Sequence, residues 1–300
     1  MHNCLVGSEM CIRDRSGGQR RDYITDIYLD ENNNIYIVGY TDTQAIDAND
    51  IWIIQSNNDG DLKEKRKISS PNGDEDITQI RWIANSQFFF TGVNQTQDNL
   101  IYGTFSYDGS NINVDYVKQV PALGGYVRSP KFMIDEYRDV FILWDVYNNA
   151  NGKFEKIQLG KLALDTANST QADAQGNQVQ VPWLWRKTLT PQGNYVSIKN
   201  TGLHVDVFGD VVVTAAIDYD EDRKVNIVSS LKYDGTIKAE SLIETTDSVG
   251  QVGKSSVVDN SGDIITFAER LIPNQLAVYR FDNSADLDYD TTKQLSLIHI

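Results

Sequence analysis

The stretch from Asp30 to Tyr40, DENNNIYIVGY, places a tight turn directly before a short run of β-branched and aromatic residues. The same combination recurs four more times, as ANSQFFFTGV from Ala84, DEYRDVFILWD from Asp135, DVFGDVVVTAA from Asp206 and DNSGDIITFAE from Asp259. The runs begin at Ile35, Phe88, Val140, Val211 and Ile264, with spacings of 53, 52, 71 and 53 residues. A fixed period of this kind indicates tandem copies of one supersecondary unit.

Each copy is predicted to contain four short strands. In the first copy they cover residues 24–29, 35–40, 51–55 and 62–68. The NNDG turn before the last strand returns as SYDG at Ser106–Gly109 and as KYDG at Lys232–Gly235. Asp-Gly between apolar runs favours a hairpin because glycine accepts the positive φ that the turn needs. The sequence therefore predicts an all-β protein, a β-propeller with five visible four-stranded antiparallel blades.

The period also predicts where the blades lie. They are expected near residues 23–75, 76–125, 126–194, 195–249 and 250–294. The long third interval assigns an insertion of about 18 residues to the polar stretch Leu164–Val181, which is expected to be a flexible surface loop. Strand aromatics are expected to pack between blades: Trp52, Trp82, Phe88, Phe90, Phe141 and Trp144. The sequence does not decide the natural number of blades, and a ring of six to eight is compatible with it.

Both ends of the chain have a feature that protein chemistry does not explain. Back-translation of Leu295–Ile300 as CTG TCT CTT ATA CAC ATC has the reverse complement GATGTGTATAAGAGACAG. Read one base in, this string encodes Met10–Asp14, and it resembles the transposase end of sequencing-library adapters. Residues 1–15 and 295–300 are therefore expected to be adapter-derived, with the native fragment covering 16–294.

Composition excludes several classes of function. Without the two ends no cysteine remains, so a disulfide framework and a cysteine-based zinc site are excluded for the fragment. The net charge of −15 repels phosphate backbones, so no nucleic-acid partner is expected. Hydrophobic residues make up 40% of the chain, but their longest runs are far shorter than a membrane span, so no membrane insertion is expected within the fragment.

The first copy, with NNNIYIVGYTDT followed by an Asp50-led strand and the NNDG turn, resembles the SBBP-type β-propeller repeat. The other copies keep the hairpin skeleton but replace the Gly-Tyr-Thr ending with TGVNQT, ILWDVY, TAAIDY and TFAERL. The resemblance implies a propeller within a multidomain, often surface-exposed protein. The family pattern carries no catalytic residues to transfer.

Loops between second and third strands, and between blades, are long and varied, so a binding face is expected there. Its carboxylates are Asp42, Asp47, Asp50, Asp74, Glu75, Asp76, Asp98, Asp218, Asp220, Glu221 and Asp222. The densest clusters, DYDED at Asp218–Asp222 and DNSADLDYD at Asp282–Asp290, are the candidates for a calcium site, although neither has EF-hand spacing. Solvated turn carboxylates are the alternative, and no cofactor or metal-ligating residue is predicted.

Catalytic signals are weak, and no catalytic residue is predicted. His204, the histidine left after the ends are removed, is expected to be a packed or exposed strand residue, and Asp26 and Lys131 are among the few charges on first strands. The leading hypothesis is a binding or scaffold module that recognises a protein or glycan. The sequons at Asn94 and Asn168 favour a secreted or cell-surface setting. The alternatives are a propeller hydrolase or lyase acting on carbohydrate or lactone, and an inert spacer.

Overall fold

The computed structural model describes residues 21–42, 50–68, 75–84, 87–94, 96–108, 111–121, 124–164, 171–172, 178–180, 183–191, 193–206, 209–219, 224–243, 251–270, 275–281 and 296–299. The chain divides into two compact units, Met1–Ala122 and Leu123–Ile300. Each unit is built of four-stranded antiparallel sheets. Within this part of the chain, no helix is long and apolar enough to cross a membrane.

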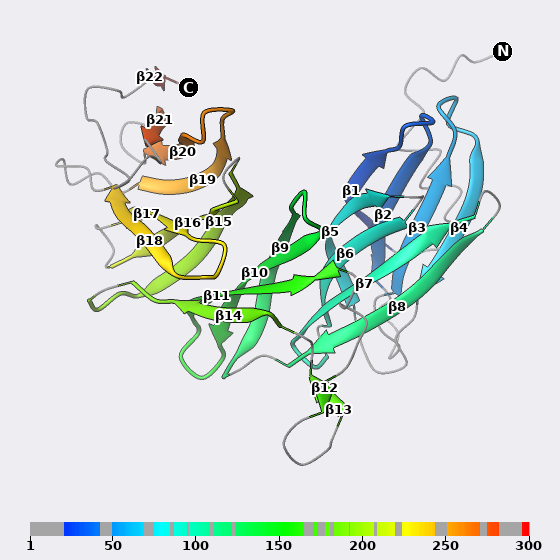
Figure 1. Cartoon of the computed structure of the whole chain (residues 1–300), viewed down its shortest axis with the longest axis horizontal. Helices are drawn as coiled ribbons and strands as arrows, with labels where there is room; N and C mark the ends of the chain where they lie inside the picture. Colours follow the sequence, from blue (N-terminus) through cyan, green and yellow to red (C-terminus); the bar gives the residue numbers. More distant parts are fainter. Residues whose placement is uncertain are drawn as a thin grey trace. The chain divides into compact units, whose positions relative to one another are not determined.

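Unit 1 contains two sheets, which Figure 1 colours from dark blue to cyan. Blade 1 consists of β1 (Arg21–Leu29), β2 (Ile35–Asp42), β3 (Asp50–Ser56) and β4 (Leu62–Ile68). Blade 2 consists of β5 (Glu75–Ala84), β6 (Gln87–Asn94), β7 (Asn99–Tyr107) and β8 (Ile112–Val120). In both sheets each strand pairs with the next one along the chain, so both are meanders.

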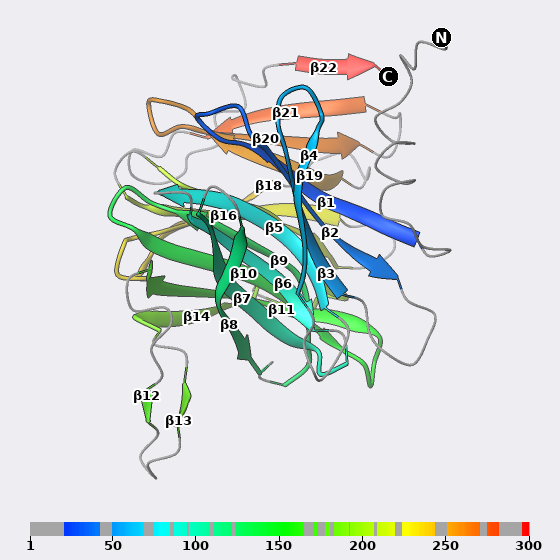
Figure 2. The ribbon, with the colours of Figure 1, turned by 90° about the vertical axis from the view of Figure 1, so that its right-hand side faces the viewer.

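Unit 2 contains three further sheets of the same kind. Blade 3 consists of β9 (Tyr126–Ile134), β10 (Asp139–Asn148), β11 (Lys153–Ala163) and β14 (Trp185–Leu189). Blade 4 consists of β15 (Ser197–Val205), β16 (Val211–Asp218), β17 (Lys224–Leu231) and β18 (Ile237–Ile243). Blade 5 consists of β19 (Gln251–Val258), β20 (Ile264–Arg270), β21 (Gln275–Phe281) and β22 (Ser296–His299), which Figure 2 shows one after another.

These five meanders confirm the predicted all-β propeller architecture. The five second strands begin at the aligned run starts or one residue before them, as at Ile35, Gln87, Asp139, Val211 and Ile264. The period of the sequence is therefore the period of the sheets. The second strand gives the clearest signal of this period. It is an inner strand of each sheet, and many of its side chains are buried.

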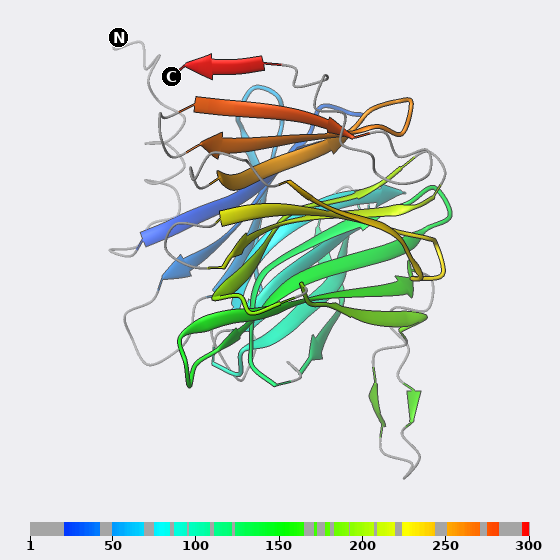
Figure 3. The same cartoon turned by 90° about the vertical axis from the view of Figure 1, so that its left-hand side faces the viewer.

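Part of the insertion in blade 3, for which the sequence predicts a flexible surface loop, forms two short strands. Within Leu164–Val181, β12 (Gln171–Ala172) and β13 (Gln178–Gln180) form a two-stranded antiparallel ribbon. Figure 3 shows this ribbon apart from the sheet that holds β11 and β14. The chain leaves blade 3 after its third strand and returns to add β14 as the fourth. Antiparallel pairing satisfies backbone groups locally, which polarity alone does not predict.

Alternate residues of the second strands pack in opposite directions. In blade 4, Val211 and Val213 join a core cluster with Phe141 and Leu143 of blade 3. The residue between them, Val212, packs instead with Ile264 and Phe281 of blade 5. Since successive side chains of a strand point to opposite faces, a strand covered on both sides is apolar throughout. This explains the uninterrupted runs FFF, VFILW and VVV.

The turn between first and second strands has the same construction in several blades. In blade 1, Asp30 Oδ1 accepts hydrogen bonds from the backbone N–H groups of Asn32 and Asn34, at 2.9 and 2.8 Å. Asn33 has a φ of 60°, in the left-handed region that asparagine and glycine tolerate. Aspartates that begin the corresponding turns accept the same kind of bond: Asp135, Asp206 and Asp259. These carboxylates therefore shape the turns.

Strand β22 lies in the segment that the nucleotide coincidence assigns to an adapter. It pairs antiparallel with β21, from Ser296 opposite Val278 to His299 opposite Gln275. Backbone pairing requires no particular side chains, so this contact says nothing about the origin of the segment. The adapter origin of residues 1–15 and 295–300 stays a prediction, and so do the blade boundaries that the repeat period predicts.

We expect Asp30→Ala to lower the free energy of unfolding by about 1–2 kcal/mol, because two turn N–H groups lose their acceptor. Asp30→Asn keeps an acceptor oxygen and should cost less. Urea denaturation followed by fluorescence measures both. Glu31→Ala, at the exposed neighbouring position, is the control. Equal effects of Asp30→Ala and Glu31→Ala would contradict this role of the turn.

Candidate functional site

The first strand of every blade contains a β-bulge where it pairs with the second strand. The register shifts lie between Ile24 and Asp26, Ile77 and Gln79, Arg128 and Lys131, Asn200 and Gly202, and Gly253 and Ser255. Bulges bend a strand and redirect its side chains. The residue after the bulge reaches the next blade in two cases. Asp26 Oδ2 accepts a hydrogen bond from the backbone N–H of Ile80 at 3.3 Å, and Lys131 Nζ donates to the carbonyl of Thr201 at 2.8 Å.

The two first-strand charges noted in the sequence are thus both engaged between neighbouring blades. Blade 4 has Gly202 at the same position. A Cβ on Gly202 would lie 2.1 Å from Ser256 Oγ and 2.7 Å from Thr214 Oγ1. Glycine therefore leaves room for side chains of its own blade and of blade 5.

Those side chains form a hydrogen-bonded chain, which we call the hydroxyl network: Thr201, Thr214, Ser256 and His204. Thr201 Oγ1 donates to Thr214 Oγ1 at 3.0 Å, and the Thr214 and Ser256 hydroxyls lie 2.9 Å apart. His204 Nε2 lies 2.8 Å from Ser256 Oγ. Burial lowers the pKa of His204, and a hydrogen bond with Ser256 opposes this effect. The network joins β15 and β16 of blade 4 to β19 of blade 5.

A serine beside a histidine is also the arrangement of a nucleophile and its base. Here the Ser256 residue is only 2% exposed, and its hydroxyl is shared with Thr214. The pair therefore faces the contact between two blades, where a substrate carbonyl has no access. Its chemistry is that of a buried polar group that is satisfied by hydrogen bonds. His204 is a half-buried residue of β15, whereas the sequence left open whether it would be packed or exposed.

A second polar contact joins blades 3 and 4. Asp145 of β10 is 1% exposed, and its Oδ1 accepts hydrogen bonds from the backbone N–H and the side-chain Nδ2 of Asn200, both at 2.8 Å. Asn200 Nδ2 also donates to the carbonyl of Ser129 at 3.2 Å. Burial raises the pKa of Asp145 to about 7, although the bonds from Asn200 and the charge of Lys131 oppose the rise.

A tyrosine from the third-to-fourth strand turn connects blades on the turn side. In unit 2, the Tyr233 hydroxyl of the KYDG turn donates to Asp139, which also forms a 2.9 Å ion pair with Lys161. The Tyr233 ring lies 6.2 Å from Phe141 of blade 3. Burial and this carboxylate raise the pKa of Tyr233. In unit 1 the SYDG turn makes a similar ring contact, since the ring centroids of Tyr107 and Tyr36 lie 6.1 Å apart.

Comparison with protein-family models matches residues 16–44 to the SBBP β-propeller repeat. The chain therefore contains an SBBP-type β-propeller repeat. The matched SBBP segment includes β1, the Asp30 turn and β2, which are the bulge, the turn and the central strand of blade 1. No curated protein matches the chain.

Solved structures similar to this SBBP-type chain are distant. A hypothetical protein from Leishmania major matches with 9% identity and a TM-score of 0.38, over 93% of this chain and 89% of its own. A Lactobacillus plantarum protein matches with 12% identity and a TM-score of 0.49, over 92% and 70%. An exo-β-1,3-galactanase from Phanerochaete chrysosporium matches with 10% identity and a TM-score of 0.43, over 86% and 60%. At this similarity they carry no functional information.

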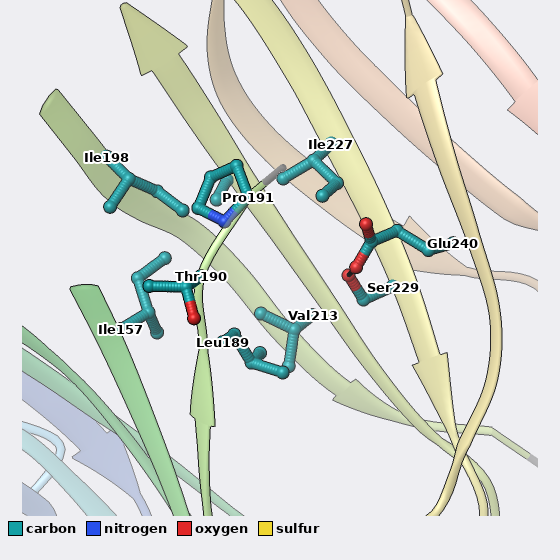
Figure 4. A pocket seen from close by; sticks show the side chains of 10 residues that line it. Ile157, Leu189, Thr190, Pro191, Ile198, Val213, Ile227, Ser229 and Glu240 are labelled. Carbon is teal, nitrogen blue, oxygen red and sulfur yellow. Dashed lines mark hydrogen bonds between the residues drawn. The ribbon is translucent and has the colours of Figure 1, made fainter. Parts of the chain in front are cut away.

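A small pocket lies between blades 3 and 4 of the SBBP-type propeller (Figure 4). Its wall is mostly apolar, from Ile157, Leu189 and Ile198, and Ser229 Oγ donates to Glu240 Oε2 at 3.2 Å at one edge. The cavity volume is about 10 Å³, which holds about one water molecule. The pocket is therefore a packing gap and is too small for a glycan.

The acidic loop face that the sequence predicts is only partly described. Glu75, assigned to that face, is instead buried in β5 with 2% exposure. Asp218 is half-buried and accepts a hydrogen bond from Ser197 Oγ at 3.0 Å. Asp47, Asp74, Asp220–Asp222 and Asp282–Asp290 lie outside the described residues. Within the described ranges, no group of three or more His, Cys, Asp or Glu side chains could hold a metal ion.

Sequence reasoning did not single out Asp145, Asn200, Gly202 or Ser256. Asp145 has a visible signal, because it is the one carboxylate inside the apolar run VFILWDV. A charge in the middle of a central strand must be paired or neutralised. The other three carry no such signal, since their roles depend on which blade lies beside them.

We expect Gly202→Ala to destabilise unit 2 by about 1–3 kcal/mol, because the new methyl group overlaps Ser256 Oγ. Adding Ser256→Ala removes that hydroxyl and should recover part of the loss. A double-mutant cycle by thermal unfolding measures this coupling. Strictly additive changes in stability would show that the side chains at positions 202 and 256 do not contact each other.

We expect His204 to take up its proton at a lower pH than an exposed histidine does, because burial lowers its pKa. Stability from this group is present above the unfolded value of about 6.5 and is lost as the pH falls below it. A proton NMR titration of the histidine ring signals measures the pKa, with the urea-unfolded chain as the reference. A His204 pKa in the folded chain at or above the value in the unfolded chain would contradict its burial.

Proposed function

We propose that this chain is a non-catalytic binding or scaffold module of a secreted or cell-surface protein, and that it recognises a protein or glycan through the acidic loop face. The main support is the state of the charged and nucleophilic groups near the first strands. Asp26, Lys131, His204 and Ser256 are all engaged in contacts between blades. Groups committed in this way stabilise the scaffold and are not free to act on a substrate.

The turn side offers a useful contrast to the loop face. Its aspartates, such as Asp30 and Asp259, accept hydrogen bonds from turn N–H groups and so have a structural role. Carboxylates of the loops after the second strands, such as Asp42, Asp47 and Asp50, add to the net charge of −15 that a partner could meet. Exposed charges of one sign attract a basic partner over roughly one Debye length, about 8 Å at physiological salt.

The experiment is a glycan array together with a pull-down of basic proteins from the source organism, using the purified chain. We expect binding that weakens as salt is raised. The triple variant Asp42→Asn, Asp47→Asn, Asp50→Asn should weaken it by about tenfold, if each carboxylate contributes roughly 0.5 kcal/mol. The turn-side variant Glu31→Gln, Asp59→Asn, Glu136→Gln removes the same charge and should bind like the wild type.

Two outcomes would overturn the proposal. Equal binding by the loop variant and the turn-side variant would show that the acidic loop face is not the binding surface. Glycan or lactone hydrolysis by the wild type that is abolished by Ser256→Ala would favour the alternative, a propeller hydrolase.

A further inference from the structure

Asp145 occupies an unusual place for a carboxylate. It lies in the middle of β10, the strand of blade 3 that is buried along most of its length. On the two flanking strands, it is paired with Arg128 of β9 and Ile157 of β11. Its hydrogen-bonding partner, Asn200, belongs to the first strand of blade 4. A single buried carboxylate thus connects two blades.

The amide of Asn200 has a fixed orientation. Its Nδ2 donates to Asp145 Oδ1 and to the Ser129 carbonyl, so both N–H groups point to acceptors. Asn200 Oδ1 is then left buried without a hydrogen-bond partner. A buried acceptor without a donor costs about 1–3 kcal/mol. An ionised Asp145 has no hydrogen to offer, whereas a neutral carboxyl has one on Oδ2.

The charges around Asp145 act in the opposite direction to its burial. Lys131 of β9 and Lys199 of β15 favour the ionised form. The Arg128 guanidinium, on β9, lies over the rings of Tyr126 and Tyr147, at 5.7 and 6.0 Å from their centroids. On β16, the residue paired with Asn200 is the apolar Ala215. Burial outweighs the lysines and raises the pKa of Asp145 to about 7.

We propose that Asp145 and Asn200 form a proton-dependent latch between blades 3 and 4, which is closed when Asp145 is neutral. A proton taken from solvent binds Asp145 Oδ2, and this O–H donates to Asn200 Oδ1. The existing bond from Asn200 Nδ2 to Asp145 Oδ1 then completes a reciprocal acid–amide pair. Loss of the proton leaves a buried charge and an unpaired carbonyl at the same contact, so the two blades pack less tightly.

The sign of the pH dependence follows from the raised pKa. Unfolded Asp145 ionises near pH 3.9, and folded Asp145 near pH 7. The stability that the latch contributes is full below pH 4, is lost progressively as the pH rises to 7, and changes no further above it. His204 contributes with the opposite sign, so the test compares variants that share His204.

The experiment is urea unfolding of the whole chain at intervals from pH 4.5 to 8. Tryptophan fluorescence reports on blade 3, where Trp144 and Trp183 lie 5.8 Å apart. Asp145→Asn keeps the shape and the donor of the neutral form but does not titrate. As the pH is raised towards 7, we expect the ratio of the wild-type unfolding constant to that of Asp145→Asn to increase by roughly tenfold per pH unit. Above pH 7 the ratio should level off. Glu136→Gln, an exposed carboxylate, should follow the wild type.

A second measurement keeps the test decisive if Asp145→Asn does not fold. Carbon-13 NMR of the Asp145 carboxyl should show a titration midpoint near pH 7 in the wild type. Asn200→Ala keeps the backbone N–H donor but removes the amide, so the midpoint should move and the latch should be lost. A midpoint near the ordinary aspartate value would overturn the proposal. Parallel pH profiles of wild type and Asp145→Asn would do the same.

Discussion

Blade 4 has two apolar faces, and a neighbouring blade covers each of them. The central strand of blade 4 shows the constraint most directly, since Val211 and Val213 pack with blade 3 and Val212 packs with blade 5. Full burial of a valine or leucine side chain contributes about 1.5–3 kcal/mol. With several such side chains on each face, blade-to-blade packing supplies most of the stabilisation, and a lone blade would be marginal.

This constraint governs where polar groups are tolerated. Near the first strands, polar side chains face neighbouring blades that offer little water, so each must find a partner across the contact. Lys131, Asp145 and Ser256 do so through Thr201, Asn200 and His204. First-strand bulges lie next to Lys131 and Asn200, and Gly202 provides the space that Ser256 needs. Similar bulges therefore support different contacts in different blades.

Much of the architecture is readable from the sequence because it is local. A turn aspartate, a residue tolerant of positive φ and a run of β-branched residues are neighbours in the chain, and together they define a hairpin. The spacing between Ile35 and Phe88 is the length of one blade, so its recurrence gives the number of blades. Local signals fail where the chain departs from the repeat. The polar stretch Leu164–Val181 contains the ribbon β12–β13, and Glu75, next to a loop in sequence, lies inside β5.

The sequence by itself determined the five-blade repeat, the two-faced apolar strands and the acidic charge, because periodicity and composition need no knowledge of distant contacts. Only the tertiary structure decided what the exceptional residues do. Asp145 and Asn200 are 55 positions apart, and His204 and Ser256 are 52 apart. Each distance is close to one blade, so the partners meet only when adjacent blades pack face to face. Burial in that contact then changes the pKa of Asp145 and of His204 in ways that no local pattern contains.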